Sequence, residues 1–586
     1  MFYVNNELII TCFNLPENYS IISLMIRNIL ENSIKTALWE LKIDKSNPVI
    51  NLEHPEDLSH GDYSTNIAMV LAKHVAQNPR ELAEKIVAEI KERLPKEISK
   101  IEVAGPGFIN FYLSGEFFVL QNKEILKAGK KFGQSKVGKG KKVIVEYSSP
   151  NIAKPFTIGH LRSTVIGDAV ANILDFSGFK VIRDNHLGDW GTQFGKLIVA
   201  IKKWSSVSEI QKSKTPIKDL VALYVKFHDE AEKDLKLEDE ARGWFTNLEN
   251  KNKEARKIWD ICVELSMKEF EKIYKRLGVK FDTAYGESFF EDKMKEVIED
   301  VKKIGIARES EGAYLVFFEK EKYPPMMLLK KDGSSIYALR DLAADKFRKK
   351  KYGKDTIIIN EVGMEQSLHF QQLFETEKLL GYTKEGDRVH IAHGFYRFPE
   401  GKMSTRKGNG IWLDDVLNEA IEKANAFDKD SAEIVGIGAI KFNDLKRESS
   451  KDIIFNWDEI LNLTGDSGPY LQYSYARAKS ILRKAKDERV KSNIKAKNSG
   501  SETNSLEKIL YRFPEIVERA GNEYSPHYIA TYLIELASSF NSFYATGKIV
   551  DKKDAESPYK VALTEAFSIV LKNGLNLLGI QAPEKM

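Results

Sequence analysis

The sequence predicts an α/β protein with a parallel nucleotide-binding sheet of the doubly wound type, an α/β region before it and an all-helical region after it. A β–loop–α–β pattern covers residues 142–183, and further strand patterns lie at 355–360 and 388–393. A long charged helical stretch, about 195–278, separates these two groups of strands, so we expect an insertion to divide the sheet. From Ser467 onward the pattern is helical.

The length and composition are those of a soluble globular protein with several domains. The chain has 586 residues, too many for one compact core, which indicates three or four domains. Hydrophobic residues make up 42% and charged residues 30%, and no apolar run approaches the roughly 18 residues that span a bilayer. The first residues lack the basic region and cleavage site of a secretion signal. We therefore expect a cytoplasmic protein that does not contact a membrane.

The two cysteines, Cys12 and Cys262, indicate reduced cytosolic thiols. Neither has a second cysteine or a histidine at the spacing of zinc ligands, and their number excludes a disulfide framework. We therefore expect no structural metal bound by the protein.

The net charge of +4 says little about nucleic acid, but the basic residues are unevenly placed. Between Arg477 and Lys497 there are nine lysines and arginines against only Asp487 and Glu488. At helical spacing such a stretch is either a solvated face or a helix that follows phosphates. The sequence leaves both interpretations open. The polar residues 498–505 that follow are expected to form a loop.

Residues 1 to about 135 have a mixed α/β pattern. Helical patterns occur in three places, at residues 22–41, 65–77 and 79–94. A Gly/Pro turn then leads into the alternating run Phe108–Leu113, a predicted strand. The Lys/Gly-rich residues 133–142 are typical of a linker.

A Gly-His pair stands where a predicted strand, Lys142–Tyr147, passes through a loop into a helix. The helix begins at Gly159 and reaches about Phe176. A helix N-terminus offers free N–H groups and partial positive charge to a phosphate. Gly159 lets a ligand approach the backbone, and His160 is placed to reach a phosphate oxygen. Taken alone, the pair is better explained as a simple helix cap.

A second segment, Gly401–Asn409, places Lys402, Arg406 and Lys407 close together between glycines. A loop of this kind brings cations to a polyphosphate, although alone an ordinary basic surface loop is the better explanation. Both segments together, in this order, are hard to explain by chance. They resemble the two signatures of class I aminoacyl-tRNA synthetases, His-x-Gly-His and Lys-Met-Ser-Lys.

The flanking sequence is similar to one branch of this class, the arginyl-tRNA synthetases. The similarity covers nearly the whole chain. It is carried by the runs His60–Ala68, Ser149–Pro155, Gly159–Thr164, Asp184–Gly195, Tyr337–Ala343 and Val362–Phe370.

The resemblance implies a class I synthetase fold with a Rossmann-type catalytic domain at 136–465 and a helical insertion at about 195–335. It also implies an additional N-terminal α/β domain at 1–135, which touches the tRNA elbow near the D-loop, and a C-terminal all-α anticodon-binding bundle at 466–586. The implied activity joins L-arginine to tRNA(Arg) with ATP, and activation needs bound tRNA. Magnesium enters with ATP, whose phosphates supply most of its ligands. The resemblance further implies a monomer.

The resemblance also assigns site residues. The catalytic set is Lys154, Thr157, Gly159, His160, Lys402, Ser404 and Lys407. The ATP contacts are Gly159, His160, His369, Lys402, Met403 and Ser404. The arginine contacts are Glu146, Asn151, Tyr337, Asp341 and Gln366, with Glu287 as a weaker candidate.

Two of the arginine contacts also have a physical rationale. A guanidinium needs planar, bidentate acceptors. Tyr337 and Asp341 are four residues apart in a helical pattern, so they share a face. The resemblance implies that Asp341 binds the guanidinium of arginine, with Tyr337 beside it. Without the surrounding match, a hydrogen-bonded pair within one helix would be the preferred explanation.

The expected tRNA contacts are less distinctive. Phe108 and Asn110 fit a stacking and hydrogen-bonding pair for the tRNA elbow, but ordinary alternating strand residues explain them about as well. Tyr470 and Tyr473 are one helical turn apart and fit stacking on anticodon bases, with Arg477 opening the basic run. Aromatic residues at this spacing are otherwise usually core residues.

Two positions depart from the family pattern. The family usually has histidine where this chain has Thr157, and Thr405 replaces the second lysine of Lys-Met-Ser-Lys. Threonine donates a hydrogen bond but carries no charge. In the family, a lysine just before the Gly-His pair compensates for the missing loop lysine, and Lys154 stands at that place.

Two alternatives were weighed against this interpretation. Another class I synthetase is disfavoured, because a cysteinyl enzyme needs metal-ligand cysteines. Isoleucyl, valyl or leucyl enzymes need a longer editing insertion than residues 195–330 allow. A non-catalytic, tRNA-binding paralogue is supported only by Thr157. The intact Gly159, His160, Lys402 and Ser404 argue against it.

Overall fold

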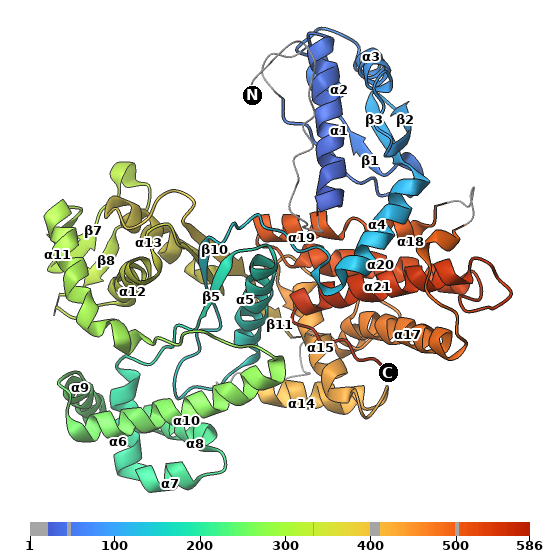
Figure 1. Cartoon of the computed structure of the whole chain (residues 1–586). Coiled ribbons are helices and arrows are strands. Elements are labelled where there is room, and N and C mark those ends of the chain that lie inside the picture. The colour runs from blue at the N-terminus through green and yellow to red at the C-terminus, as the bar shows by residue number, and fades with distance from the viewer. Residues whose placement is uncertain (1–20, 44–47, 332, 399–410, 498–502) are drawn as a thin grey trace. The chain divides into compact units, whose positions relative to one another are not determined.

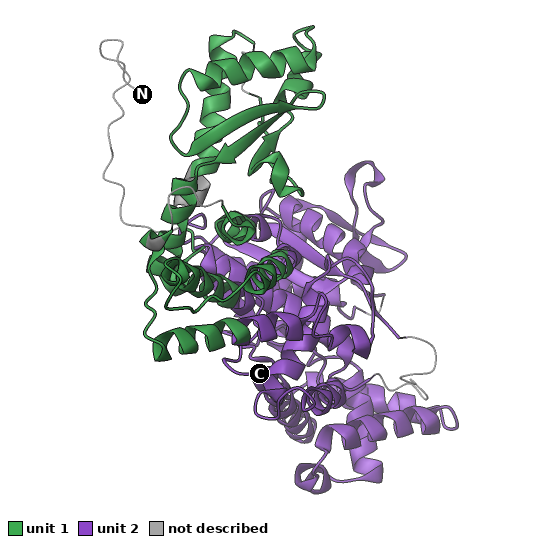
Figure 2. Cartoon of the chain, turned by 90° about the vertical axis from the view of Figure 1, so that its right-hand side faces the viewer, with its two compact units in different colours: residues 1–135, 477–518, 532–573 green, residues 136–476, 519–531, 574–586 purple. Residues whose placement is uncertain are grey.

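A computed structural model describes residues 21–43, 48–331, 333–398, 411–497 and 503–586. The chain forms two compact units, which Figure 2 shows in different colours. Unit 1 comprises residues 1–135, 477–518 and 532–573, and unit 2 comprises residues 136–476, 519–531 and 574–586. The C-terminal helices are thus divided between the two units. The three-domain division expected from the sequence stays a prediction.

The N-terminal part of unit 1 is a three-stranded antiparallel sheet with helices packed against it (Figure 1). The strand order is β1-β3-β2. The elements are α1 (Ile21–Glu40), β1 (Tyr63–Thr65), α2 (Ile67–Ala72), α3 (Pro79–Lys91), β2 (Ile98–Ala104), β3 (Phe108–Leu113) and α4 (Gly115–Ala128). The helices predicted at 22–41 and 79–94 and the strand predicted at 108–113 are confirmed.

Two details of this sheet differ from the prediction. The helix predicted at 65–77 is only α2, because Tyr63–Thr65 instead pairs with β3 as strand β1. Strand β2 was not predicted. A β-bulge between Ile98 and Lys100 interrupts its alternation of buried and exposed side chains, so the two-residue period is hidden.

Unit 1 also contains α18 (Ser505–Leu510) and most of the C-terminal helices. Helices α17 (Gly468–Asp487), α19 (Phe513–Asn522), α20 (His527–Ala545) and α21 (Ser557–Leu577) run across the division between the units. Within unit 1, the buried Tyr511 ring lies 5.4 Å from the ring of Phe117 and 5.6 Å from that of Phe118. Tyr511, which directly follows α18, therefore belongs to the same apolar core as the N-terminal sheet.

Unit 2 is built on a four-stranded, fully parallel sheet with the order β10-β9-β4-β5. Its strands are β4 (Lys142–Glu146), β5 (Lys180–Asp184), β9 (Ile357–Gly363) and β10 (Arg388–His393). Helix α5 (Ile158–Phe176) connects β4 to β5, and α13 (Ser367–Leu379) connects β9 to β10. This confirms the predicted class: a Rossmann-type parallel sheet interrupted by an insertion.

The strand order places a natural binding crevice at the carboxyl ends of β4 and β9. The chain leaves β4 towards β5 on one side and later returns to β9 on the other side. Ligands of open α/β sheets bind at such a switch point, outside the carboxyl ends of the strands.

The insertion between β5 and β9 is not purely helical. Its helices are α6 (Gln193–Trp204), α7 (Val207–Lys212), α8 (Pro216–Ala231), α9 (Lys236–Glu249), α10 (Lys253–Leu277), α11 (Met294–Ile304) and α12 (Tyr337–Tyr352). A small antiparallel sheet, β6 (Ala307–Ser310), β7 (Ala313–Val316) and β8 (Met326–Leu329), precedes α12. These strands were not predicted: β6 is polar and mostly exposed, and β7 and β8 are apolar runs of only four residues each.

After β10 the chain forms a short parallel pair and further helices. These elements are β11 (Tyr396–Arg397), α14 (Leu413–Ala424), α15 (Ala432–Leu445), β12 (Ile453–Ile454) and α16 (Trp457–Ile460). No helix among the described residues is long and apolar enough to cross a membrane. Cys262 is buried and unpaired, and Cys12 lies outside the described residues.

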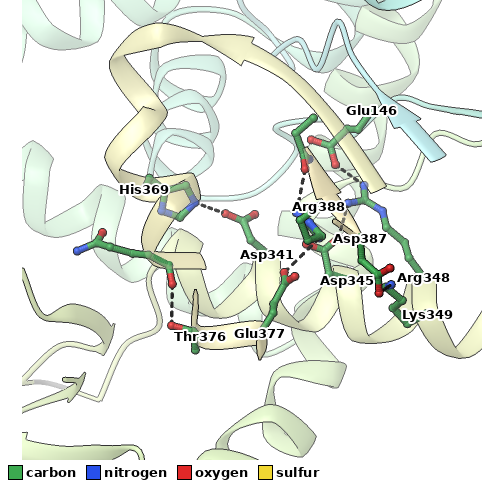
Figure 3. A network of polar contacts seen from close by, with 12 residues as sticks. Glu146, Asp341, Asp345, Arg348, Lys349, His369, Thr376, Glu377, Asp387 and Arg388 are labelled. Atoms are coloured by element: carbon green, nitrogen blue, oxygen red, sulfur yellow. Dashed lines mark hydrogen bonds and ion pairs between the residues drawn. The ribbon is translucent and has the colours of Figure 1, made fainter. Parts of the chain in front are cut away.

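A buried guanidinium joins α12 to the sheet (Figure 3). Arg348 Nη2 lies 2.5 Å from a Glu146 oxygen at the end of β4 and 2.6 Å from an Asp184 oxygen at the end of β5. Arg348 Nη1 donates to Asp345, one turn earlier on α12, at 2.8 Å. Asp345 also pairs with Arg388 of β10. These side chains are nearly inaccessible to solvent, so their charges must be matched within the protein.

Two neighbouring carboxyls of this network have opposite pKa shifts. Burial alone would raise the pKa of Asp345, but Arg388 and Arg348 outweigh burial and hold this pKa below its ordinary value. Burial raises the pKa of Glu377 well above its ordinary value, although Arg388 opposes the rise. The two arginines therefore stabilise the negative charge mainly on Asp345.

Replacing Arg348 by Met should destabilise this part of unit 2, because Glu146, Asp184 and Asp345 would lose their shared cation. Breaking a buried ion pair costs about 3–5 kcal/mol. Hydrogen exchange of the α12 and β4 amides measures this locally, without assuming two-state unfolding of a two-unit chain. Lys346→Met on the same helix removes a partly exposed pair with Asp300 and should cost less than about 1 kcal/mol. Equal protection in both variants would contradict the prediction.

Candidate active site

The loop between β4 and α5 has a strained backbone. Ser148, Ser149 and Ala153 all have positive φ, at 72°, 45° and 57°. Each such non-glycine residue costs on the order of 1–3 kcal/mol and persists only where its surroundings hold it. Sequence reasoning identified the loop but not the strain.

Hydrogen bonds from three directions hold this loop. The Ser148 N–H donates to Ser163 Oγ of α5 at 2.9 Å. The Ser149 N–H donates to Asn185 Oδ1 at 3.1 Å, and the Ala153 N–H donates to Ser266 Oγ of α10 at 2.9 Å. The inserted helix α10 is therefore part of the support of the site.

Asn151 lies in this loop against Gly188. The Ile152 N–H donates to the Gly188 carbonyl at 3.0 Å, and the Gly188 N–H donates to the Pro150 carbonyl at 3.1 Å. A Cβ at Gly188 would lie 2.2 Å from Asn151 Oδ1. Glycine is therefore required at position 188 to leave room for the Asn151 amide.

Thr157 and His160 contact each other at the start of α5. The Thr157 N–H donates to His160 Nδ1 at 3.0 Å, and Thr157 Oγ1 lies 3.0 Å from the same nitrogen. A nitrogen that accepts carries no proton, so the neutral ring is protonated on Nε2. The threonine hydroxyl thus faces His160, and the catalytic role assigned to Thr157 stays a prediction.

His160 is neutral at physiological pH. Burial lowers its pKa to about 4, and the nearby charges of Lys154 and His393 act in the same direction. His160 therefore offers a phosphate the Nε2–H hydrogen bond and not a positive charge.

Two glycines of α5 differ in what surrounds them. Gly159 is exposed, and among the described residues an added Cβ would meet only Thr157 Oγ1, at 3.5 Å. At Gly167 the added Cβ would lie 2.2 Å from Tyr147 Cβ. The protein's own packing therefore requires glycine at 167 but not at 159, where the open face leaves room for a ligand.

The segment that follows the second signature pairs with the start of α5. The Ile158 N–H donates to the Ile411 carbonyl at 3.0 Å, and the Leu413 N–H donates to the Phe156 carbonyl at 2.9 Å. The predicted residues Lys402, Met403, Ser404 and Lys407, together with Thr405, lie outside the described residues. Their assigned roles stay predictions.

Tyr337, Asp341 and His369 lie together where α12 and α13 begin. His369 Nε2 lies 2.7 Å from Asp341 Oδ2, as Figure 3 shows. The Tyr337 and His369 rings are 4.7 Å apart, and Tyr337 is 55% exposed. His369, assigned to ATP from the sequence, is thus in contact with the residue assigned to the guanidinium. Gln366 is exposed just before α13.

Glu287 adds a second carboxylate near Asp341. Its N–H donates to the Leu187 carbonyl at 3.0 Å, in the loop that also contacts Asn151. Burial raises the pKa of Glu287 to about 7, and the negative charge of Asp341 adds to the rise. The positive charges of Arg340 and His186 oppose the rise, and a further cation bound beside Glu287 would act in the same direction.

Glu146, assigned to arginine from the sequence, has an internal partner. Its carboxylate pairs with Arg348, on the face of the sheet that α12 covers (Figure 3). Sequence reasoning missed Arg348 and also the Glu361–His393 pair, in which His393 Nδ1 lies 2.8 Å from Glu361 Oε1. Buried charged residues at strand ends were the signal that could have identified both pairs.

The predicted tRNA contacts lie in different surroundings. Phe108 is exposed on β3, whereas Asn110 is buried, with its Oδ1 2.7 Å from Ser64 Oγ. Tyr473 is exposed and Tyr470 half-buried on α17. Arg477 lies in unit 1, where Nη1 donates to Asn541 Oδ1 at 2.5 Å. All five assignments stay predictions.

The site contains no candidate metal cage. Within the described part of the chain, no group of three or more His, Cys, Asp or Glu side chains is arranged to hold a metal ion. The carboxylates of the site have other neighbours. Asp341 is paired with His369, Glu146 is paired with Arg348, and Glu287 lies near Asp341.

Three family models match consecutive parts of the chain. They are the arginyl tRNA synthetase N-terminal domain at residues 26–113, the catalytic domain of class I (R) tRNA synthetases at 121–457, and the DALR anticodon-binding domain at 471–586.

Relatives match over nearly the full length. The arginine–tRNA ligase of Halothermothrix orenii is 42% identical over 95% of this chain and 99% of its own length. That of Clostridium acetobutylicum is 43% identical over 91% and 96%. The crystal structure of the Plasmodium falciparum arginyl-tRNA synthetase has a TM-score of 0.80, with 26% identity over 96% of this chain and 99% of that one. The Thermus thermophilus arginyl-tRNA synthetase has a TM-score of 0.77, with 26% identity over 96% and 100%. The chain belongs to the arginyl-tRNA synthetase family of class I aminoacyl-tRNA synthetases.

Proposed function

We propose that this chain is an arginine–tRNA ligase, which activates L-arginine with ATP and transfers it to tRNA(Arg). The observation that carries the proposal is the Asp341 carboxylate, which lies 2.7 Å from His369 Nε2 beside the exposed Tyr337 and close enough to Glu287 to raise its pKa. A guanidinium is the cation that matches such a carboxylate, because it is always charged and donates in a planar fork.

Arginine recognition centres on Asp341, which receives the guanidinium with Tyr337 beside it. His369 holds one Asp341 oxygen at 2.7 Å, which orients the carboxylate. Glu287 is a second acceptor near Asp341, and the bound guanidinium lowers its pKa from about 7. Asn151 and Gln366 also contact the bound arginine, and neither residue is assigned to a particular atom of it. Glu146 contributes to arginine binding through its ion pair with Arg348.

ATP occupies the start of α5. The open face of Gly159 lets the triphosphate approach the backbone, and the helix N-terminus offers partial positive charge. His160 donates from Nε2, and Lys154 adds a positive charge nearby. By resemblance, Lys402, Met403, Ser404 and Lys407 also contact ATP. Magnesium enters with the substrate as MgATP, with the phosphates as its main ligands.

The chemistry takes two steps. An oxygen of the arginine carboxylate attacks the α-phosphorus of ATP in line, and the bond to pyrophosphate breaks. A ribose hydroxyl of the tRNA 3′ end then attacks the adenylate carbonyl, and AMP leaves. The protein contributes mainly position and charge stabilisation, because both reacting groups in the first step, the arginine carboxylate and the α-phosphate, are anionic.

The remaining parts of the proposal rest on family resemblance. The N-terminal α/β region contacts the tRNA elbow through Phe108 and Asn110. The C-terminal helices bind the anticodon through Tyr470, Tyr473 and Arg477. The enzyme acts as a cytoplasmic monomer, without a membrane partner and without a structural metal.

Arginine activation should require tRNA, because in this family the bound tRNA completes the site. The measurement is ATP–pyrophosphate exchange with arginine, with and without tRNA(Arg). We expect exchange only when tRNA is present. Each of the other standard amino acids serves as a control and should support no exchange. Rapid exchange without tRNA would contradict the assignment.

Asp341→Asn keeps the shape of the side chain and removes the charge that faces the guanidinium. The loss of a charge-assisted contact should cost about 2–5 kcal/mol, which raises the KM for arginine by roughly 30-fold or more. The KM for ATP should change little. Steady-state aminoacylation measures both constants, and an equal increase in both would show that Asp341 is structural.

Thr157→Val should lower kcat and kcat/KM together, because the hydroxyl no longer supports His160 Nδ1. One neutral hydrogen bond is worth about 1 kcal/mol, or about 5-fold. The Thr157 N–H still holds the ring, so the effect should be smaller than that of His160→Ala. Thr157→Ser keeps the hydroxyl and should retain the wild-type rate. A Thr157→Val enzyme with wild-type kcat would remove this hydroxyl from the catalytic machinery.

A further inference from the structure

A histidine–glutamate pair lies at the carboxyl ends of β9 and β10, on the side of the sheet that faces α5. His393 ends β10, and its Nδ1 lies 2.8 Å from Glu361 Oε1 on β9. The Glu361 side chain is fully buried, and the His393 side chain is 13% exposed. A completely buried carboxylate that holds a partly exposed imidazole fixes the orientation of that ring.

The alternation of β10 places His393 on the α5 face. Arg388 pairs with Asp345 of α12 on one face, and His390 stacks at 4.6 Å on Phe370 of α13 on the same face. His393 is an odd number of residues from both, so its side chain faces the other way.

Two contacts place the pair beside the first turns of α5. Ser163, one turn after His160, donates through Oγ to the Glu361 carbonyl at 2.9 Å. The Gly394 N–H and Arg162 Nη2 both donate to the Ser449 carbonyl, each at 3.0 Å. His160 and His393 also lie close enough for the charge of His393 to lower the pKa of His160.

His393 is more readily protonated than an ordinary histidine. Burial opposes the charged ring, but the Glu361 carboxylate outweighs burial, and the pKa of His393 is raised. Asp444 of α15 adds to the rise, whereas Arg162 of α5 opposes it. The remaining titratable neighbours are His160 of α5 and His390 of β10.

The second nitrogen of His393 is available to a ligand. The ring uses Nδ1 for Glu361, and Nε2 makes no hydrogen bond to any described residue. Arg162, the other cation on this face, is 1% exposed and donates to Asp444 and to the Ser449 and Lys451 carbonyls. The guanidinium of Arg162 is therefore engaged by protein groups, whereas Nε2 of His393 is available to a ligand.

We propose that His393, oriented by Glu361, is a phosphate-binding residue of the ATP site and supplies from β10 the second imidazole that the signature at 157–160 lacks. The proposal rests on the function proposed above, which puts the triphosphate at the start of α5. The signature retains His160, but its first position is Thr157, whose hydroxyl faces His160. His160 donates as a neutral group, and His393 adds a positive charge.

The first test is equilibrium binding of MgATP to the full chain, without arginine or tRNA. His393→Gln removes a charge-assisted contact and should weaken binding about 10- to 100-fold. In tRNA-dependent pyrophosphate exchange, the KM for ATP should rise while the KM for arginine stays unchanged. His390→Gln, on the opposite face of the same strand, is the matched control and should leave ATP binding at the wild-type level.

The second test is the pH profile of kcat/KM for ATP. In the wild type this ratio should fall as pH rises through the raised pKa of His393, because the positive charge is lost. His393→Gln should lack that decline. Glu361→Gln keeps a hydrogen-bond partner but removes the carboxylate, so the decline should move to lower pH. A purely structural role for the pair would leave the profile in place and change only stability.

The third test is a double-mutant cycle with Thr157→His. If His393 replaces the missing imidazole, His393→Gln should cost much less activity in the Thr157→His background than in the wild type. An equal cost in both backgrounds, or unchanged MgATP binding by His393→Gln, would overturn the proposal. A wild-type chain that binds MgATP but does not charge tRNA(Arg) would refute the proposed function and leave the binding test of His393 intact.

Discussion

The pairing of Arg348 with carboxylates at the ends of two strands is the interaction on which the site geometry depends. Glu146 ends β4 and Asp184 ends β5, so one guanidinium joins both strand ends to α12. Asp341 lies seven residues before Arg348, two turns away on the same face of the helix. The contact that attaches α12 to the sheet therefore also sets the position of the carboxylate proposed to bind the guanidinium of arginine.

The inserted helices support the other side of the site. Tyr274 of α10 lies 2.8 Å from Ser148 Oγ and accepts from Asn185 at 3.0 Å, and Ser266 holds the backbone of Ala153. The strained loop after β4 is thus clamped between α5 and α10. A site that positions two anions needs such preorganisation, because each misplaced contact weakens charge stabilisation in the transition state.

Much of the fold could be predicted from the sequence, because its elements have strong local signals. Strand β4 is short and apolar, and a glycine, Gly178, stops α5 before β5. Strand β6 could not be predicted, since a polar, exposed strand has no two-residue period, and the apolar strands β7 and β8 are only four residues each. The site was harder to predict, because its partners are distant in sequence. Nothing near Glu146 shows that Arg348 pairs with it, and nothing near Thr157 shows that its hydroxyl faces His160.

Gly159 and Gly167, the two glycines of α5, are under different selective pressures. At Gly167 any side chain would collide with Tyr147, so folding itself rejects substitution. At Gly159 the protein leaves space, so the fold would tolerate a larger residue and only the proposed approach of ATP would reject it. A mutational library of this helix, sorted once for soluble protein and once for growth, would therefore separate into two classes. Inherited variation at Gly159 would produce a stable, abundant and inactive protein, whereas variation at Gly167 would remove the protein altogether.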